Sequence, residues 1–350
     1  MGEMLAIKLF GTNDVRLVTC EIPKINRGEI LIKTSVAAIC GTDIRMVKNG
    51  RKGVDACHPL TLGHEISGVI EQAETDHGVY KPGMRVTVAP NFGCGTCRMC
   101  RRGDHHLCQN YTALGIHLDG CMAEYVRVPA AAVEQGNVIP IPDGISMTEA
   151  AVFEPMACVM NGQDRTEVAQ GDKVLIIGAG PIGVMQALMA HARGASRIYM
   201  NDLCRERLER CERQYPFLTP LYGRDLKAEV AAVSGNKGLD VCITACPVKE
   251  VQEQALELMA VNGRVLFFGG LPEDKDFISI HSNTIHYNQL KVTGSTRCSA
   301  AHMKRVSEMV RKRELDLSGI VTDIFRAEEY QMAINHVMAA KGIKTALTFE

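Results

Sequence analysis

Four cysteines close together in the chain form the clearest metal-binding pattern of the sequence. They follow the spacing Cys94-x2-Cys97-x2-Cys100-x7-Cys108. Four thiolates at such spacing can surround one zinc ion tetrahedrally and leave no position open for chemistry. An iron–sulfur cluster is the competing assignment, but no other feature of the sequence indicates electron transfer. The pattern therefore predicts a structural zinc site in a lobe of residues about 90–110.

A glycine-rich turn is the second chemical signature. The apolar run Val174–Ile177 leads into Gly178-Ala-Gly-Pro-Ile-Gly183, a G-x-G-x-x-G pattern, and Asp202 ends the next predicted strand. Such glycines permit a tight turn and let the backbone approach a pyrophosphate, which the following helix N-terminus attracts. A carboxylate at Asp202 can bind both ribose hydroxyls and repel a 2′-phosphate, so NAD is favoured over NADP. The predicted NAD-binding residues are Gly178, Gly180, Pro181, Ile182, Gly183, Asp202 and Arg207.

Two short motifs nearer the N-terminus indicate a second zinc site. They read Cys40-Gly-Thr-Asp43 and Gly63-His-Glu65. A catalytic zinc takes about three protein ligands and keeps one exchangeable position. Cys40 and His64 are the predicted ligands, with Glu65 and Glu154 as oxygen candidates, which makes two zinc ions per chain. Zinc there would lower the pKa of a substrate hydroxyl, and Thr42 could accept that proton and pass its own onward.

Composition narrows the class of protein. The chain has 350 residues, 39 basic and 40 acidic side chains, 46% hydrophobic residues and 14 cysteines. The near-neutral charge predicts no nucleic-acid partner and no anionic membrane surface. The N-terminus lacks an apolar signal core, so we expect a cytoplasmic protein with reduced thiols. The nine cysteines outside the two zinc sites are expected to be inert, mostly buried side chains.

The elements expected around these motifs change in type along the chain. Short β-like runs such as 30–36 and 85–90 fill the first 150 residues or so. Apolar runs then alternate with helical patterns, which predicts βαβ units and a doubly wound parallel sheet in an α/β fold. The expected strands are 174–177, 197–201, 239–244, 264–268 and 345–349, and the expected helices are 182–193, 205–214, 249–261 and 299–313.

Taken together, these motifs resemble a known family over essentially the full chain. The chain is similar to zinc-dependent medium-chain dehydrogenases of the alcohol dehydrogenase type. Its Phe153-Glu-Pro155 resembles the polyol (sorbitol-like), sugar-alcohol-phosphate and threonine dehydrogenase branch. The resemblance implies a GroES-like, mainly β catalytic domain at 1–155 that resumes at 295–350, and a Rossmann NAD domain at 156–294. The other matching residues are Lys81-Pro-Gly83, Asp119-Gly-Cys-Met-Ala-Glu-Tyr125, the four-cysteine lobe and the motifs above.

The same resemblance implies roles for individual residues. Glu154 would sit at the fourth position of the catalytic zinc, Asp43 would orient the histidine ligand, and Lys344 would touch the NAD pyrophosphate. Arg45 stands where many relatives have a relay histidine. Because arginine stays protonated and cannot act as a base, we expect Arg45 to contact an NAD phosphate or a phosphate or hydroxyl of the substrate. His117 and Arg297 are further substrate candidates.

The predicted activity is oxidation of a secondary alcohol, a polyol or polyol phosphate, by NAD. An amino alcohol such as threonine is the nearest alternative substrate. A catalytically silent NAD-binding sensor or structural protein is the alternative from another class, and it is disfavoured because Cys40, Thr42, His64 and Glu65 are all present. The expected partners are a small-molecule substrate and further copies of the chain, as a homodimer or homotetramer.

Overall fold

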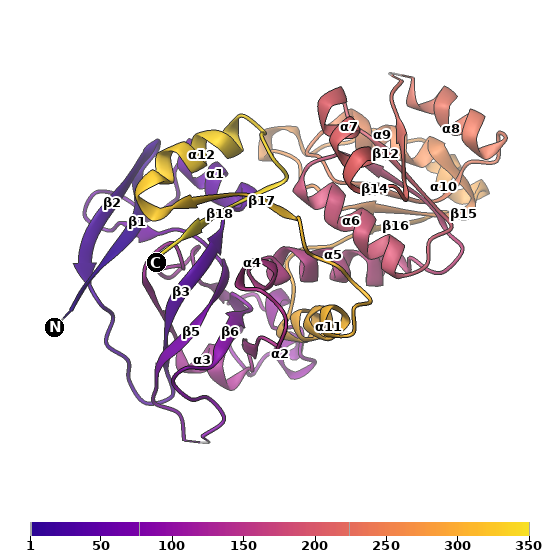
Figure 1. Ribbon diagram of the computed structural model, residues 1–350. Helices are drawn as coiled ribbons and strands as arrows, with labels where there is room; N and C mark the ends of the chain where they lie inside the picture. Colours follow the sequence, from indigo (N-terminus) through magenta and orange to yellow (C-terminus); the bar gives the residue numbers. More distant parts are fainter. Residues whose placement is uncertain (1, 77, 224, 350) are drawn as a thin grey trace. The chain divides into compact units, whose positions relative to one another are not determined.

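The computed structural model describes residues 2–76, 78–223 and 225–349. The chain forms two compact units (Figure 1). The first comprises Met1–Ala157 and Arg297–Glu350, and the second comprises Cys158–Thr296. Each unit has its own sheets, so each is described separately. Within the described residues, no helix is long and apolar enough to span a membrane.

The first unit is built mainly from antiparallel strands, with β17 and β18 paired in parallel. Its largest sheet has the order β10-β6-β5-β3-β18-β17, with β9 also paired to β3. Strand β18 comes from the end of the chain and pairs antiparallel with β3, so the C-terminal segment closes the sheet begun near the N-terminus (Figure 1). Smaller sheets join β2-β1-β4 and β7-β8. The strands are β1 (Glu3–Gly11), β2 (Asp14–Glu21), β3 (Ile30–Ala38), β4 (Leu60–Thr61), β5 (Glu65–Ala73), β6 (Arg85–Val88), β7 (Asn91–Phe92), β8 (Thr112–Ala113), β9 (Tyr125–Val128), β10 (Val138–Pro140), β17 (Val321–Arg326) and β18 (Lys344–Thr348).

Short helices connect these strands. Most have fewer than ten residues, because the turns between strands leave little room for regular helix. Helix α5 continues from this unit into the second along the chain. The α-helices are α1 (Gly41–Asn49), α2 (Arg98–Arg101), α3 (Ala130–Glu134), α4 (Met147–Ala151), α5 (Phe153–Thr166), α11 (Ala300–Arg311) and α12 (Tyr330–Met338), and 3-10 turns cover His105–Leu107 and Ala327–Glu329.

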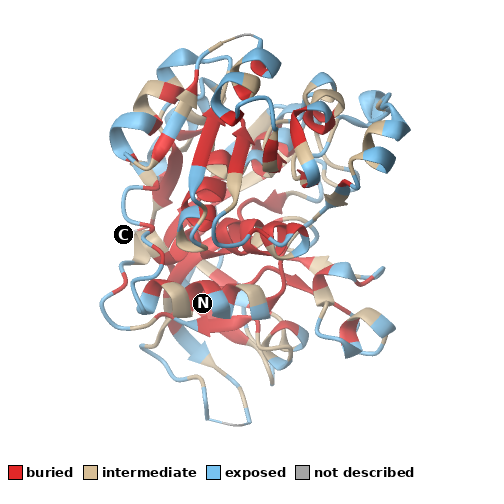
Figure 2. Cartoon of the chain, turned by 90° about the vertical axis from the view of Figure 1, so that its right-hand side faces the viewer, coloured by how far each residue is buried: buried red, intermediate tan, exposed pale blue. Residues whose placement is uncertain are grey.

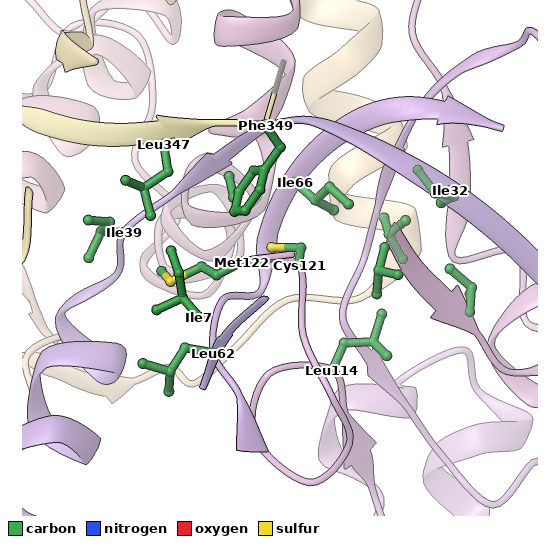
Figure 3. Packing of buried hydrophobic residues seen from close by; sticks show 14 of the residues in the cluster. Ile7, Ile32, Ile39, Leu62, Ile66, Leu114, Cys121, Met122, Leu347 and Phe349 are labelled. Carbon is green, nitrogen blue, oxygen red and sulfur yellow. The ribbon is translucent and has the colours of Figure 1, made fainter. Parts of the chain in front are cut away.

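The core of the first unit forms around the inner faces of its strands. Ile7, Ile32, Leu62 and Met122 are almost completely buried and belong to one cluster with Leu347 from the last strand (Figure 3). Burial of such a side chain contributes about 1.5–3 kcal/mol of favourable transfer free energy. The core therefore uses side chains from both ends of the sequence.

The second unit has the doubly wound parallel sheet that the alternating pattern predicts. Its strand order is β13-β12-β11-β14-β15-β16, and every pairing is parallel. The order reverses between β11 and β14, which is where open α/β sheets bind ligands. The elements are β11 (Lys173–Ile177), α6 (Pro181–Ala192), β12 (Arg197–Asn201), α7 (Arg205–Gln214), β13 (Leu218–Leu221), α8 (Leu226–Ser234), β14 (Leu239–Thr244), α9 (Lys249–Ala255), β15 (Met259–Phe267), α10 (Ser282–Tyr287) and β16 (Lys291–Gly294), with 3-10 turns at Leu256–Leu258 and Glu273–Lys275.

Burial follows the central strands of this sheet. The inner strands β11 and β14 are mostly buried, whereas α7 and α10 expose much of their surface (Figure 2). The predicted helix 249–261 is wrong at its end, because residues from Met259 onward belong to β15 and Met259 pairs with Leu239. Pairing with a neighbouring strand overrides the local helical pattern there.

Candidate metal centres and nucleotide-binding turn

The four-cysteine loop brings its sulfur atoms together. The Sγ atoms of Cys94, Cys97, Cys100 and Cys108 all lie within 4.8 Å of one another. Cys97 Sγ is 3.5 Å from Cys100 Sγ and 3.8 Å from Cys108 Sγ. Four sulfurs bound tetrahedrally at the usual Zn–S distance of about 2.3 Å lie about 3.8 Å apart, whereas a disulfide holds its sulfurs at about 2.05 Å. The donor set therefore fits a four-thiolate zinc site.

Local backbone geometry prepares these thiols to bind a cation. Hydrogen bonds led by the backbone N–H of Thr96 lower the pKa of the Cys94 thiol to about 6. The backbone N–H of Cys100 likewise lowers the pKa of Cys97. Burial instead raises the pKa of Cys100 to about 12, so this thiol needs a bound cation to lose its proton at neutral pH. A Cβ at Gly93 would lie 2.4 Å from Cys100 Sγ, so only glycine fits beside the cluster.

A second group of ligand atoms forms where α1 meets β5. The ligand atoms of Cys40, His64 and Glu65 lie within 4.8 Å of one another. Cys40 is the N-cap residue of α1, and Glu65 begins β5. Glu65 Oε2 is buried and accepts no hydrogen bond from the described residues. Because a buried carboxylate oxygen is costly without a partner, this donor set fits a metal ion.

Asp43 connects the segments that carry these ligands. Its Oδ2 accepts the backbone N–H of Cys40 at 2.9 Å, and its Oδ1 accepts that of Gly63 at 3.2 Å. The same Oδ1 lies 3.7 Å from His64 Nδ1. Burial disfavours protonation of His64, but Cys40 and Asp43 raise its pKa well above the ordinary value. The carboxylate thus lies where a residue that orients the histidine ring is needed.

Glu154 lies close to this group without joining it. It is buried on α5, and its negative charge contributes to the raised pKa of His64. Cys298 Sγ lies 3.8 Å from Glu154 Oε1 and 3.7 Å from its backbone oxygen. The prediction that Glu154 occupies the fourth zinc position stays a prediction. The contact with Cys298 was missed, because no motif distinguishes this cysteine from the others thought inert.

Lys344 forms a buried ion pair with one of the predicted zinc ligands. Its Nζ lies 2.7 Å from Glu65 Oε1, and the two side chains are 5% and 0% exposed. Burial alone would lower the pKa of Lys344, but the charges of Glu65 and Cys40 raise it above the ordinary value. Lys344 is therefore held within the first unit by Glu65. Its predicted contact with the NAD pyrophosphate stays a prediction.

The remaining catalytic and substrate candidates also lie in the first unit. Arg45 Nη2 donates to Thr42 Oγ1 at 3.1 Å. Arg297 donates from Nη1 to the backbone oxygen of His106 at 2.5 Å, and its guanidinium lies 3.8 Å from the ring centre of Tyr111. Tyr111 in turn contacts His117 edge to face at 5.1 Å. Arg297, Tyr111 and His117 therefore form one chain of contacts that the sequence did not reveal, since Tyr111 carries no motif.

Arg297 is held in an unusual backbone conformation. Its φ is +56°, a left-handed value that costs a non-glycine residue free energy.

Burial, together with the positive charges of Arg51 and Arg297, lowers the pKa of His117. His117 is consequently neutral near physiological pH and able to accept as well as donate a hydrogen bond.

The second unit places the glycine-rich turn at the carboxyl end of β11. A Cβ on Gly183 would lie 1.7 Å from the backbone oxygen of Gly178, so the turn requires glycine there. Pro181 opens α6, whose first turn contains Ile182, and Gly180 caps the helix. The N–H groups of this helix end are therefore available to an anion.

Asp202 secures the turn from the neighbouring strand. Its Oδ2 accepts the backbone N–H of Ala179 at 2.7 Å, and its Oδ1 accepts that of Cys204 at 2.8 Å. Arg207 Nη1 lies 3.8 Å from the same Oδ2. The predicted nucleotide-binding residues of this unit are thus gathered around one turn.

The sequence matches two family models and is similar to known dehydrogenases over most of its length. Residues 26–143 match the alcohol dehydrogenase GroES-like domain, and residues 181–312 match the zinc-binding dehydrogenase domain. The chain is 29% identical to a sorbitol dehydrogenase of Bacillus subtilis (strain 168) over 342 residues, which are 97% of this chain and 95% of that protein. It is 30% identical to an L-threonine 3-dehydrogenase of Anaeromyxobacter dehalogenans (strain 2CP-C) over 332 residues, with 93% and 92% covered.

A solved structure shows the same fold over the whole chain. It is described as a zinc-binding dehydrogenase from Sinorhizobium meliloti 1021 bound to NADP, and it superposes with a TM-score of 0.90 at 27% identity. The similarity covers 100% of both chains. Zinc and a nicotinamide dinucleotide are thus the cofactors that these residues and similarities support.

Substitution of a cysteine in the four-thiol cluster should remove one zinc ion. We expect Cys100→Ala to lower the zinc content by about one ion per chain, because three thiolates and no fourth protein ligand leave the structural site incomplete. Mass spectrometry of the metal content of purified protein measures this. Cys211→Ala removes another buried thiol, which belongs to none of the ligand groups, and is the matched control. An unchanged zinc content in Cys100→Ala contradicts the assignment.

Loss of Lys344 should destabilise the first unit. Lys344→Met leaves the Glu65 carboxylate buried without its cation, and removing one partner of such a pair costs about 3–5 kcal/mol. The free energy of unfolding, measured by urea titration with circular dichroism, should fall by this amount. The exposed Lys341 lies three residues earlier, and Lys341→Met should change stability by less than about 0.5 kcal/mol. Equal stability of the two variants would refute the role of the ion pair.

Proposed function

We propose a reaction on the premise that the chain belongs to the zinc-dependent medium-chain alcohol dehydrogenase family. In this reaction the protein oxidises a secondary hydroxyl of a polyol to a ketone, with NAD as the oxidant. The observation that carries the proposal is the grouping of Cys40, His64 and Glu65 within 4.8 Å beside Thr42. The family supplies the reaction class, and the sorbitol dehydrogenase relative supports a polyol substrate.

The first unit supplies the groups that act on the hydroxyl. Cys40, His64 and Glu65 would hold zinc, with Glu154 as a fourth ligand or close neighbour. Zinc at this position supplies a Lewis acid that lowers the pKa of the substrate hydroxyl. Thr42 follows Cys40 by two residues and offers a hydroxyl that can accept the substrate proton and donate its own. Asp43 accepts the backbone N–H groups of Cys40 and Gly63. Its Oδ1 lies 3.7 Å from His64 Nδ1 and would orient the ring by a small approach of the two side chains.

The second unit would bind the dinucleotide, whose nicotinamide would supply the hydride acceptor. The Gly178–Gly183 turn and the start of α6 would hold the pyrophosphate, since they present backbone N–H groups and permit close approach. Asp202 would bind the adenosine ribose hydroxyls. Its two hydrogen bonds with backbone N–H groups hold the carboxylate just beyond the carboxyl end of β12.

A second substrate class is an amino alcohol of the threonine type. The 30% identity to an L-threonine 3-dehydrogenase is the observation that favours it. A phosphorylated polyol is the third class to test, because Arg45 and Arg297 carry positive charge in the same unit as Thr42. His117 and Arg297 are the residues that we propose to contact the distal part of the substrate.

Assembly and location belong to the same proposal. We place the protein in the cytoplasm, where its clustered thiols would stay reduced and able to bind zinc. A homodimer or homotetramer is supported by exposed aromatic side chains in the second unit. Phe277 and Tyr287 are 83% and 76% exposed, and Tyr287 precedes the edge strand β16. Exposed apolar side chains beside an open strand edge favour contact with another protein surface.

A screen of NAD reduction tests the activity. Purified protein is incubated with NAD and a panel of polyols, polyol phosphates and threonine, and NADH absorbance is followed. Cys40→Ser should lower turnover of the best substrate by at least about 10³-fold, because the predicted ligand set and its Lewis acid are lost. The circular dichroism spectrum should not change. Cys20→Ser, on the edge strand β2, should keep full activity, and an active Cys40→Ser variant would refute the zinc site.

Asp202 should set the preference between the two dinucleotides. Asp202→Asn keeps an oxygen that accepts a hydrogen bond but removes the negative charge. We expect kcat/KM with NAD to fall about tenfold or more and kcat/KM with NADP to rise, because a charged hydrogen bond contributes about 1.5–3 kcal/mol. Asp225→Asn, at the N-cap of α8, is the control. An unchanged ratio of NAD to NADP efficiency contradicts this role for Asp202.

A further inference from the structure

The side chain of Arg45 reaches the hydroxyl that we propose for proton transfer. Arg45 Nη2 donates a hydrogen bond to Thr42 Oγ1 at 3.1 Å. The two residues are three positions apart on α1, so their side chains share one face of the helix. Thr42 is half-buried, whereas Arg45 is exposed. The arginine therefore covers the solvent side of the threonine hydroxyl.

This contact limits what the Thr42 hydroxyl can do. A threonine hydroxyl has one hydrogen to donate and two lone pairs, whereas a guanidinium has only donors and keeps its protons. Arg45 accordingly occupies one lone pair of Thr42 Oγ1. The other lone pair and the hydroxyl hydrogen stay available, which are the two features needed to accept one proton while giving another.

The backbone around Thr42 is already fixed, so its side-chain torsion is the freedom that remains. Asp43 accepts the N–H of Cys40 on one side of Thr42 and the N–H of Gly63 from the facing segment. Both bonds tie the first turn of α1 to the predicted zinc ligands. A threonine near the start of a helix divides its χ1 between two rotamers. A donor that hydrogen-bonds to Oγ1 favours the rotamer that points the hydroxyl toward it.

We propose that Arg45 is a positioning residue that holds the Thr42 hydroxyl in the orientation for proton transfer. The inference rests on the proposed function and deepens it. During oxidation the substrate O–H proton passes to Thr42 Oγ1, and the original Thr42 proton passes to a water molecule. The carbon–hydrogen bond breaks, its electron pair leaves as hydride to NAD, and the carbonyl forms. Arg45 keeps all its protons and contributes only the hydrogen bond and its charge.

The first test measures the orientation of Thr42 without turnover. Protein with ¹³C-labelled threonine methyl groups is compared with Arg45→Met, which keeps the side-chain length but has no donor. The missing signal in Thr42→Val assigns the Thr42 methyl group. In Arg45→Met we expect the three-bond couplings of Thr42 to show averaging between rotamers and its methyl order parameter to fall. Arg45→Lys should restore part of the order. Identical couplings in Arg45→Met and the native protein overturn the proposal.

The second test separates positioning from phosphate binding. With the best substrate of the screen, Arg45→Met should lower kcat about tenfold or more, while KM for NAD stays within about twofold. Arg45→Lys should recover most of kcat. Lys48→Met removes an exposed cation from the last turn of the same helix and should leave both constants unchanged. A raised KM for NAD with unchanged kcat overturns the proposal and assigns Arg45 to the dinucleotide phosphates.

Failure of the positioning role can be distinguished from failure of the proposed function. If the native protein oxidises none of the alcohols tested, the proposed function fails, and the methyl measurements still decide whether Arg45 orders Thr42. If the native protein is active and the Thr42 rotamer does not depend on Arg45, the proposed function stands and the positioning role is refuted.

Discussion

The buried carboxylate of Asp43 is the constraint on which the predicted catalytic centre depends. It is 1% exposed, and a charge buried to that extent is tolerated only when its oxygens are hydrogen-bonded. Those bonds come from two separate segments, the N-terminus of α1 and the residue before His64. Satisfying one carboxylate therefore fixes Cys40 and His64 relative to each other, although 23 residues separate them in the chain (positions 41 to 63). The first turn of α1, with Thr42 in it, takes its position from the same bonds.

Close backbone packing around Gly63 connects the same arrangement to the segment that follows the four-cysteine lobe. A Cβ on Gly120 would lie 2.1 Å from the oxygen of Gly63, and one on Gly115 would lie equally close to it. The backbone of the segment that follows Cys108 thus packs closely against Gly63, the residue before His64. The same segment contains Tyr111 and His117. The four-cysteine site contributes no open ligand position. A zinc ion bound there would cross-link the loop that supplies these side chains and so restrict its chain entropy.

Local motifs allowed much of this to be predicted. The glycine turn, the four-cysteine spacing and the Cys40 and His64 motifs each lie within a short stretch, and hydrophobic periodicity identified the parallel sheet. Contacts between distant residues could not be predicted in the same way. The ion pair of Lys344 with Glu65 was not predicted, because it forms only where the last strand returns beside β3. The Arg45–Thr42 hydrogen bond was also missed, since the sequence shows that arginine is not a base but does not show where its donors point.

The pairing of Glu65 with Lys344 has a consequence for when the first unit can finish folding during synthesis. Lys344 comes 279 residues after Glu65 in the chain. At about 5–20 residues per second, a ribosome completes that stretch in roughly 15–55 s. Throughout this time the nascent N-terminal segment carries a glutamate whose countercharge does not yet exist. The ion pair therefore forms only once the last strand has entered the sheet beside β3, and the burial of Glu65 with its cation is a late step in the folding of the first unit.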